Sequence, residues 1–216
     1  MAITAKLVSE LRAKTGAGMM DCKKALVEND GDMDKAIEYL QKKSLAAVAK
    51  RSDKVAAEGA VYSYIHDGRV GAMVEVNSET DFVARGEQFQ TMIKNIAMHI
   101  AASTPLYLDA SEIPEEVTEK QKEIYAAQLL AEGKPEAMIE KIMDGKIKKW
   151  HSDVCLLNQS YVKDDKLTIE QYVTEVASTI KENIKIRRFV RFELGEGIEK
   201  KEEDFAAEVA ATVAGV

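Results

Sequence analysis

Few side chains in this sequence are spaced as catalysis or metal binding would require. The three histidines, His66, His99 and His151, lie far apart and form no H-E-x-x-H or similar pattern. Gly16 and Gly18 follow a predicted helix instead of a strand, so they do not resemble a phosphate-binding loop. The sequence therefore predicts no catalytic residue, no metal ligand and no cofactor, and it disfavours a nucleotide-binding enzyme.

One short segment does combine residues that suit recognition. The sequence E-T-D-F-V-A at residues 79–84 places a carboxylate beside a large aromatic side chain, between a predicted strand and a predicted helix. In one interpretation Thr80 or Asp81 caps the helix and Phe82 anchors it to the core. In the other, Asp81 and Phe82 face a partner. The pattern alone leaves both interpretations open.

The residues on either side of this segment predict a β-hairpin and a helix. Asp67-Gly68 lies between two alternating runs, which is a strong hairpin signal. One face of the second strand would carry Val70, Ala72, Val74 and Val76. The helix after the segment would bury Phe89, Met92, Ile93, Ile96 and Ile100. We therefore expect a sheet covered by a helix.

Three short helices are predicted before residue 50. Thr4 can cap the first helix, Gly16 with Gly18 ends it, and the second helix ends near residues 29–31. Together they would bury one small core, and the arrangement resembles a ubiquitin-associated-type bundle. Residues 41–57 are rich in Lys, Arg and Ala, so we interpret them as a partly helical linker.

The second half of the chain predicts further helices and one more strand. Residues 114–149 should form two helices, and Thr168 with Gln171 makes a capping box for another. The following strand alternates, so one face would carry Ile184, Ile186, Val190, Phe192 and Leu194. A last helix, free to dock on a partner, would carry Phe205, Val209 and Val213 on one side.

Composition narrows the class of protein. The 216 residues are 46% apolar and 31% charged, which is typical of a folded chain of one or two domains. A net charge of −7 disfavours nucleic acid and anionic membranes as partners. Cys22 and Cys155 fit no disulfide framework, and no run of about 18 apolar residues occurs. A cytoplasmic location is therefore expected.

Four segments resemble conserved segments of the elongation factor Ts family. The two most specific are LRAKTGAGMMDCKKAL at residues 11–26 and EVNSETDFVAR at residues 75–85. The other two are AMHIAAS at residues 97–103 and FELGEGIEKKEEDFAAEVAA at residues 192–211. The resemblance thus extends from the first helix almost to the last residue.

The resemblance implies an α+β fold in three parts. These are an N-terminal helical bundle at residues 1–50, a core at residues 51–197 and a C-terminal helical module at residues 198–216. The core, a dimerisation and exchange domain, would be an antiparallel sheet with packed helices. The implied function is guanine nucleotide exchange on elongation factor Tu, the GTPase of translation elongation, without any catalysed covalent reaction.

The resemblance also implies which residues meet the GTPase. In this family the Asp-Phe pair of a T-D-F-V segment enters the partner near its nucleotide-bound magnesium, and here the segment is Thr80, Asp81, Phe82 and Val83. Further implied or expected partner contacts are Arg12, Met19, Met20, Lys23, His99 and Phe205. From the residues alone, one of the two methionines could instead seal the bundle.

Longer members of the family carry a duplicated sheet unit and an inserted helical hairpin, from which this chain departs. The short architecture is found in members that form homodimers, so a homodimer is one expectation and a monomer the other. Two other functions also stay open. One is an adaptor that uses the bundle without exchange activity, and the other is a metal-dependent hydrolase that uses the histidines.

Overall fold

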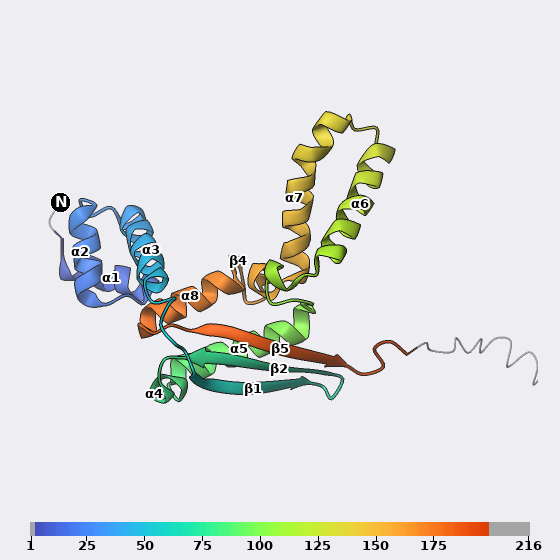
Figure 1. Cartoon of the computed structure of the whole chain (residues 1–216). Coiled ribbons are helices and arrows are strands. Elements are labelled where there is room, and N and C mark those ends of the chain that lie inside the picture. Colours follow the sequence, from blue (N-terminus) through green and yellow to red (C-terminus); the bar gives the residue numbers. More distant parts are fainter. Residues whose placement is uncertain (1–2, 199–216) are drawn as a thin grey trace, which may run out of the picture.

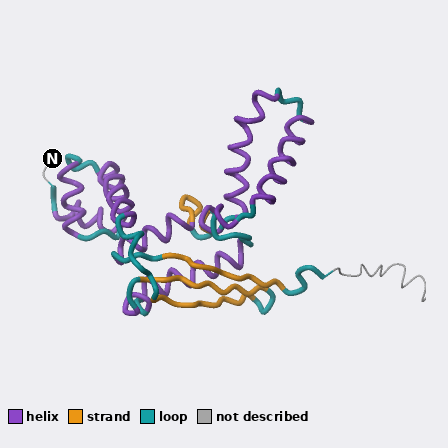
Figure 2. The backbone as a smooth tube through the Cα atoms, viewed as in Figure 1, coloured by secondary structure: helices purple, strands orange, loops and turns teal. Residues whose placement is uncertain are grey.

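The computed structural model of the chain describes residues 3–198, without the side chains of residues 44, 45, 136 and 137. It is an α+β structure in which helices precede, interrupt and cover a small antiparallel sheet (Figures 1 and 2). Two separate hydrophobic clusters form its interior, one in the N-terminal helices and one between the sheet and the helices packed on it.

The N-terminal bundle consists of α1 (Ala5–Thr15), α2 (Met19–Glu28) and α3 (Met33–Ala49). As expected, the Thr4 side chain caps α1 by accepting from the Leu7 amide. Asp32, which was not predicted as a cap, accepts from the Asp34 and Lys35 amides at the start of α3. The small core of the bundle contains Val8, Leu11, Cys22, Ala25, Leu26, Ala36 and Leu40. Helix α3 continues to Ala49, so the first part of the predicted linker is helical, and its Val48 packs against the cluster between the sheet and its helices.

The sheet has the strand order β1-β2-β5, with β1 at Glu58–His66, β2 at Val70–Ser78 and β5 at Lys185–Glu193. Both pairings are antiparallel. The β1–β2 hairpin is confirmed, and its turn residues Asp67 and Gly68 have φ of 49° and 65°, which suits a tight hairpin turn. Ala72, Val74 and Val76 of β2 are buried on the inner face.

Helix α5 (Glu87–Ser103) covers the inner face of the sheet, and the apolar stripe predicted for it is fully buried. Helix α8 (Ile169–Ile180) packs against α5 and begins with the predicted capping box of Thr168 and Gln171. In the sequence between α5 and α8 there are two 3-10 helices, at Ala110–Glu112 and Leu156–Asn158. The same stretch contains a two-stranded sheet of β3 (Ser160–Tyr161) and β4 (Asp164–Thr168).

Strand β5 differs from the prediction in which side chains it buries. Val76 of β2 pairs with Ile186, whereas Glu75 pairs with Arg188, so Arg187 is an extra residue in a β-bulge. Because side chains alternate along a strand, one extra residue exchanges the two faces beyond it. Ile184 and Ile186 are buried as predicted, but Val190, Phe192 and Leu194 are exposed. The prediction of one continuous apolar face was therefore wrong.

Helices α6 (Glu115–Ala131) and α7 (Glu136–Val154) form an antiparallel hairpin that projects from the body (Figure 1). Two helices were predicted here, but not this projecting arrangement. Within its described side chains only Leu129 is fully buried, and Lys146 lies over the Tyr125 ring at 5.2 Å. The sequence analysis expected this chain to differ from longer family members, which carry an inserted helical hairpin. The structure nevertheless contains a helical hairpin, formed by α6 and α7.

Candidate partner-binding surface

The segment between β2 and α5 forms one turn of helix, α4 (Asp81–Ala84). Thr80 caps it, because its Oγ1 accepts from the Val83 amide at 3.3 Å. Ala84 is buried, and Val83 packs partly on the core. The Phe82 side chain, however, is 84% exposed. Of the two interpretations of this segment, the capping role holds for Thr80, but Phe82 does not anchor the helix to the core.

Asp81 lies beside Phe82 on the same exposed turn. Its Oδ2 is 3.1 Å from Nη2 of Arg85, and both side chains are largely exposed. An ion pair in such a solvated position contributes little to stability. The Asp81 carboxylate therefore stays accessible to solvent beside Phe82.

The bundle presents a second set of exposed side chains on α1 and on the first turns of α2. Met19 is 49% exposed and Met20 75%, so both face solvent and neither is part of the bundle core. Arg12 and Lys23 are exposed as well. Two flexible, polarisable thioethers on a surface suit contact with another protein.

Val27, which was not predicted as a partner contact from the sequence, extends this exposed surface of the bundle. It is 56% exposed and lies two helical repeats after Met19, in the series Met19, Lys23 and Val27. The sequence could have indicated this, because helical neighbours recur every three to four positions and Val27 follows Met19 by two such steps. The bundle surface is therefore larger than predicted.

His99, expected to contact a partner, is buried in this structure. Its Nε2 lies 3.0 Å from Oε1 of Gln159, and its Nδ1 accepts from the Val162 amide at 3.3 Å. Burial lowers the pKa of His99, which favours the neutral ring. A direct partner contact would require uncovering this ring, so its visible role is to join α5 to the segment before β4.

Phe205, the remaining expected contact, lies outside the described residues. The other histidines do not approach His99: His66 is 3.0 Å from the Tyr64 hydroxyl in the hairpin, and His151 lies against Trp150. Residues 3–198 contain no group of three His, Cys, Asp or Glu side chains arranged to hold a metal ion. In the same part of the chain, no helix combines the length and apolar character needed to cross a bilayer.

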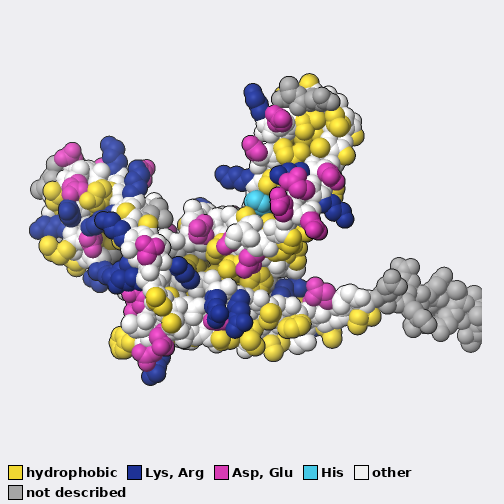
Figure 3. Space-filling model, viewed as in Figure 1, with side chains coloured by type: hydrophobic (Ala, Val, Ile, Leu, Met, Phe, Trp, Pro, Cys, Tyr) yellow, Lys and Arg dark blue, Asp and Glu magenta, His cyan; other side chains and the backbone are white. Residues whose placement is uncertain are grey.

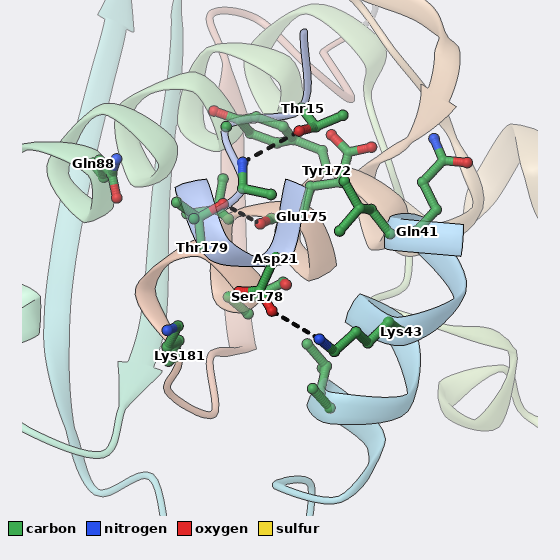
Figure 4. A pocket seen from close by; sticks show the side chains of 18 of the residues that line it. Thr15, Asp21, Gln41, Lys43, Gln88, Tyr172, Glu175, Ser178, Thr179 and Lys181 are labelled. Carbon is green, nitrogen blue, oxygen red and sulfur yellow. Dashed lines mark hydrogen bonds and ion pairs between the residues drawn. The ribbon is translucent and has the colours of Figure 1, made fainter. Parts of the chain in front are cut away.

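A cleft of about 770 Å³ separates the bundle from α5 and α8 (Figure 4). Asp21 and Lys43 form an ion pair of 2.7 Å on its bundle side, and this hydrogen bond lowers the pKa of Asp21. On the opposite side, burial raises the pKa of Glu175. Arg51 also lines the cleft and contacts Glu79 at the base of the Phe82 turn. The cleft therefore lies at the joint between the two exposed surfaces.

The bundle and α4 lie at the same end of the sheet, away from the projecting hairpin (Figure 1). Exposed apolar side chains on two well-defined turns are typical of a surface that binds another protein. The chain is therefore an α+β protein with exposed apolar side chains at this end that would suit contact with another protein.

Comparison with known proteins is consistent with that description. The family model described as elongation factor TS matches residues 2–196. Proteins named elongation factor Ts are 58% identical in Geobacter metallireducens and 56% in Alkaliphilus oremlandii and Acetivibrio thermocellus. The matches cover 98% of both chains for the first, 99% of both for the second, and 99% and 100% for the third. The chain belongs to the elongation factor Ts family.

Proposed function

We propose that this protein is the guanine nucleotide exchange factor of elongation factor Tu and works in the cytoplasm during translation elongation. Membership of the elongation factor Ts family supports this function over an adaptor or a hydrolase. The observation that carries the mechanism is the Phe82 side chain, 84% exposed on a one-turn helix beside Asp81. An aromatic residue in this position suits insertion into an apolar slot of a partner.

The mechanism requires coupling between two binding events and no covalent step. If the factor lowers the GTPase's affinity for GDP, then GDP must lower its affinity for the factor by the same ratio. Bound GDP is held partly through Mg²⁺, whose octahedral geometry tolerates little distortion. Phe82 would insert into the GTPase and hold its magnesium site in a distorted conformation. Asp81 would disturb the groups that surround the ion. GTP then refills the emptied site.

The bundle, residues 1–50, would add affinity by docking Met19, Met20 and Val27 on the GTPase. Residues 51–197 would then carry the exchange turn, and residues 198–216, with Phe205, a further docking helix. This division assigns binding mainly to the ends of the chain and nucleotide release to α4.

Release of a fluorescent GDP analogue from purified elongation factor Tu tests the proposed function. Small amounts of this protein should accelerate release many-fold, because each molecule acts repeatedly. An adaptor would bind the GTPase and leave the release rate unchanged, and that result would contradict the proposal. A hydrolase would instead retain a bound metal through purification, which elemental analysis detects.

The outer face of the sheet also supports a homodimer as the working form. Five exposed apolar side chains share this face, as the strand register requires: Val61, Ile65, Met73, Val190 and Phe192. Hydrophobic side chains are visible over the strands in Figure 3. An antiparallel sheet normally has polar residues on a solvated face, and sheets with apolar faces pack on one another. Longer family members carry two sheet units, so a second copy would supply the missing one.

Phe192→Glu should convert this dimer into a monomer, because Phe192 is the most exposed apolar side chain of this face, at 71%, and a carboxylate buried there in the dimer is costly. Analytical ultracentrifugation measures the change. Val162→Glu, on an exposed residue away from the sheet, is the matched control and should leave the dimer intact. A parent protein that sediments as a monomer of 23.9 kDa contradicts the proposal. Truncation after Gly197 then asks whether residues 198–216 cover the face instead.

A further inference from the structure

The turn that carries Phe82 is fastened to a distant part of the chain by the carboxylate of Glu182. Oε2 of Glu182 accepts from the backbone amides of Glu79 and Thr80, each at 3.1 Å. Its Oε1 accepts from the Thr80 hydroxyl at 2.7 Å. One side chain between α8 and β5 thus accepts from three donors at the start of α4.

A second carboxylate makes the connection in the opposite direction. Oε1 of Glu79 accepts from the Asn183 amide at 2.7 Å, so residues 79 and 182–183 are joined twice. The same carboxylate lies 3.1 Å from Arg51 and 3.3 Å from Lys54, which follow the bundle. The hydrogen bond from Asn183 and these two cations lower the pKa of Glu79. Glu79 is therefore ionised at neutral pH.

The residues around Glu182 are themselves held in place. Asn183 is buried, and its Nδ2 donates to the Lys54 carbonyl at 2.7 Å. Lys185 donates to the Ser52 carbonyl at 2.9 Å. Glu182 is consequently part of a polar junction between the α8–β5 turn, the residues after the bundle, and the start of α4. We call the bonds of Glu182 and Glu79 across this junction the carboxylate latch.

We propose that Glu182 is a positioning residue for nucleotide exchange: through the carboxylate latch it holds the Thr80–Val83 turn so that Phe82 is presented to the GTPase in its inserting orientation. This inference rests on the proposed function, since it assigns Glu182 a role that acts only through Phe82. Glu79 extends the latch to Arg51 and Lys54, and so links the orientation of Phe82 to the bundle that docks beside it.

Contacts from elsewhere in the chain are needed because α4 is too short to keep its helical conformation alone. It has four residues, and a single helical turn is unstable without outside contacts. Phe82, with its side chain in solvent, adds almost no packing energy to the free protein. Ordering the turn before binding removes an entropic cost from the insertion step. Glu182 supplies that order from a part of the chain about a hundred residues away.

Glu182→Ala tests the inference by the release of a fluorescent GDP analogue from elongation factor Tu. The release rate at saturating factor should fall at least about tenfold, because the variant loses three hydrogen bonds to a carboxylate and even one such bond is worth roughly that factor. The factor concentration for half-maximal release should change little, because the bundle contacts stay intact. Glu112→Ala is the matched control: its carboxylate accepts from the Leu108 amide at 2.7 Å in another loop, and its loss should leave release unchanged.

The double variant Glu182→Ala/Phe82→Ala separates positioning from general stability. If Glu182 acts through Phe82, the double variant releases GDP at the rate of Phe82→Ala alone. The positioning role is overturned if Glu182→Ala slows release equally in the parent and in the Phe82→Ala variant. It is also overturned if Glu182→Ala releases at the parental rate while Phe82→Ala is slow. In both cases the proposed function stands. A parental rate for Phe82→Ala itself would instead remove the insertion mechanism.

Glu182→Gln keeps the test decisive if the alanine variant unfolds. The amide oxygen can still accept from the two backbone amides, and its nitrogen can donate to the Thr80 hydroxyl, so this variant should recover most of the lost rate. Recovery at an unchanged melting temperature supports the inference. A glutamine variant that melts like the parent but is as slow as the alanine variant contradicts it.

Discussion

Phe82→Ala is expected to slow GDP release from elongation factor Tu by roughly thirtyfold to a thousandfold while the protein stays folded. Truncating a buried interface aromatic typically costs about 2 to 4 kcal/mol, which corresponds to that range. The fold should not suffer, because Phe82 is 84% exposed in the free protein and makes no core contact. Release of a fluorescent GDP analogue measures the effect, with circular dichroism melting alongside.

Leu106→Ala provides a control outside the proposed surfaces, since Leu106 is also a largely exposed apolar residue, at 65%, but follows the end of α5 that is far from α4. It should retain the parental release rate per chain.

Asp81→Ala should slow GDP release more than it weakens binding, because Asp81 acts on the metal surroundings after docking. If Phe82→Ala drives release at the parental rate, insertion of this side chain is not the mechanism of exchange.

Gly59→Ala should lower the free energy of unfolding by about 3 kcal/mol, combining backbone strain with a steric clash. Gly59, in β1, has φ of 139°, a conformation that residues with a Cβ rarely adopt. An added Cβ would lie 2.7 Å from the Cα of Asn77 and closer still to the Val76 carbonyl oxygen. The strands would have to separate here, just before β2 leads into the Phe82 turn.

Urea denaturation measures this loss, and Gly71→Ala is its control in the same sheet. The nearest atom to a Cβ at Gly71 is Cγ1 of Ile65 at 4.0 Å, which is an ordinary contact. Gly71→Ala should therefore unfold close to the parent. Equal stability of the two variants would show that β1 can adopt another backbone conformation at Gly59 without cost.

Local sequence signals predicted the elements well wherever the determining contacts lie within a few residues. Thr4 and the Thr168–Gln171 pair cap the helices they precede, and Asp67-Gly68 turns the hairpin. The apolar stripe from Phe89 to Ile100 is buried against the sheet. Each of these features depends on spacing along the chain, which a sequence displays directly.

Strand β5 shows where that reasoning failed. Its residues alternate without a visible break, yet Arg187 is inserted as a bulge opposite β2. Both Arg187 and Arg188 then reach Glu75, at 2.8 and 2.7 Å, and lower its pKa. A bulge depends on the register with the neighbouring strand, so nothing within β5 alone reveals it. Because of this extra residue, Val190 and Phe192 join Val61, Ile65 and Met73 on the outer face of the sheet.

The candidate site divides in the same way. The motif at residues 79–84 and the methionines at 19 and 20 were identified from the sequence, because residue type and order along the chain mark them. Their exposure was not, since the pattern allowed Phe82 to face the core or a partner. The burial of His99 likewise depends on Gln159 and Val162, which lie about sixty residues away in the chain.

The sequence by itself determined the family, the helix caps, the hairpin and the segment that carries Asp81 and Phe82. Only the tertiary structure decided which side of each element faces solvent, and it brought Glu182 to the amides of Glu79 and Thr80 across more than a hundred residues. The physical reason is that caps and turns form between near neighbours, whereas burial, strand register and the carboxylate latch arise only when distant segments pack together.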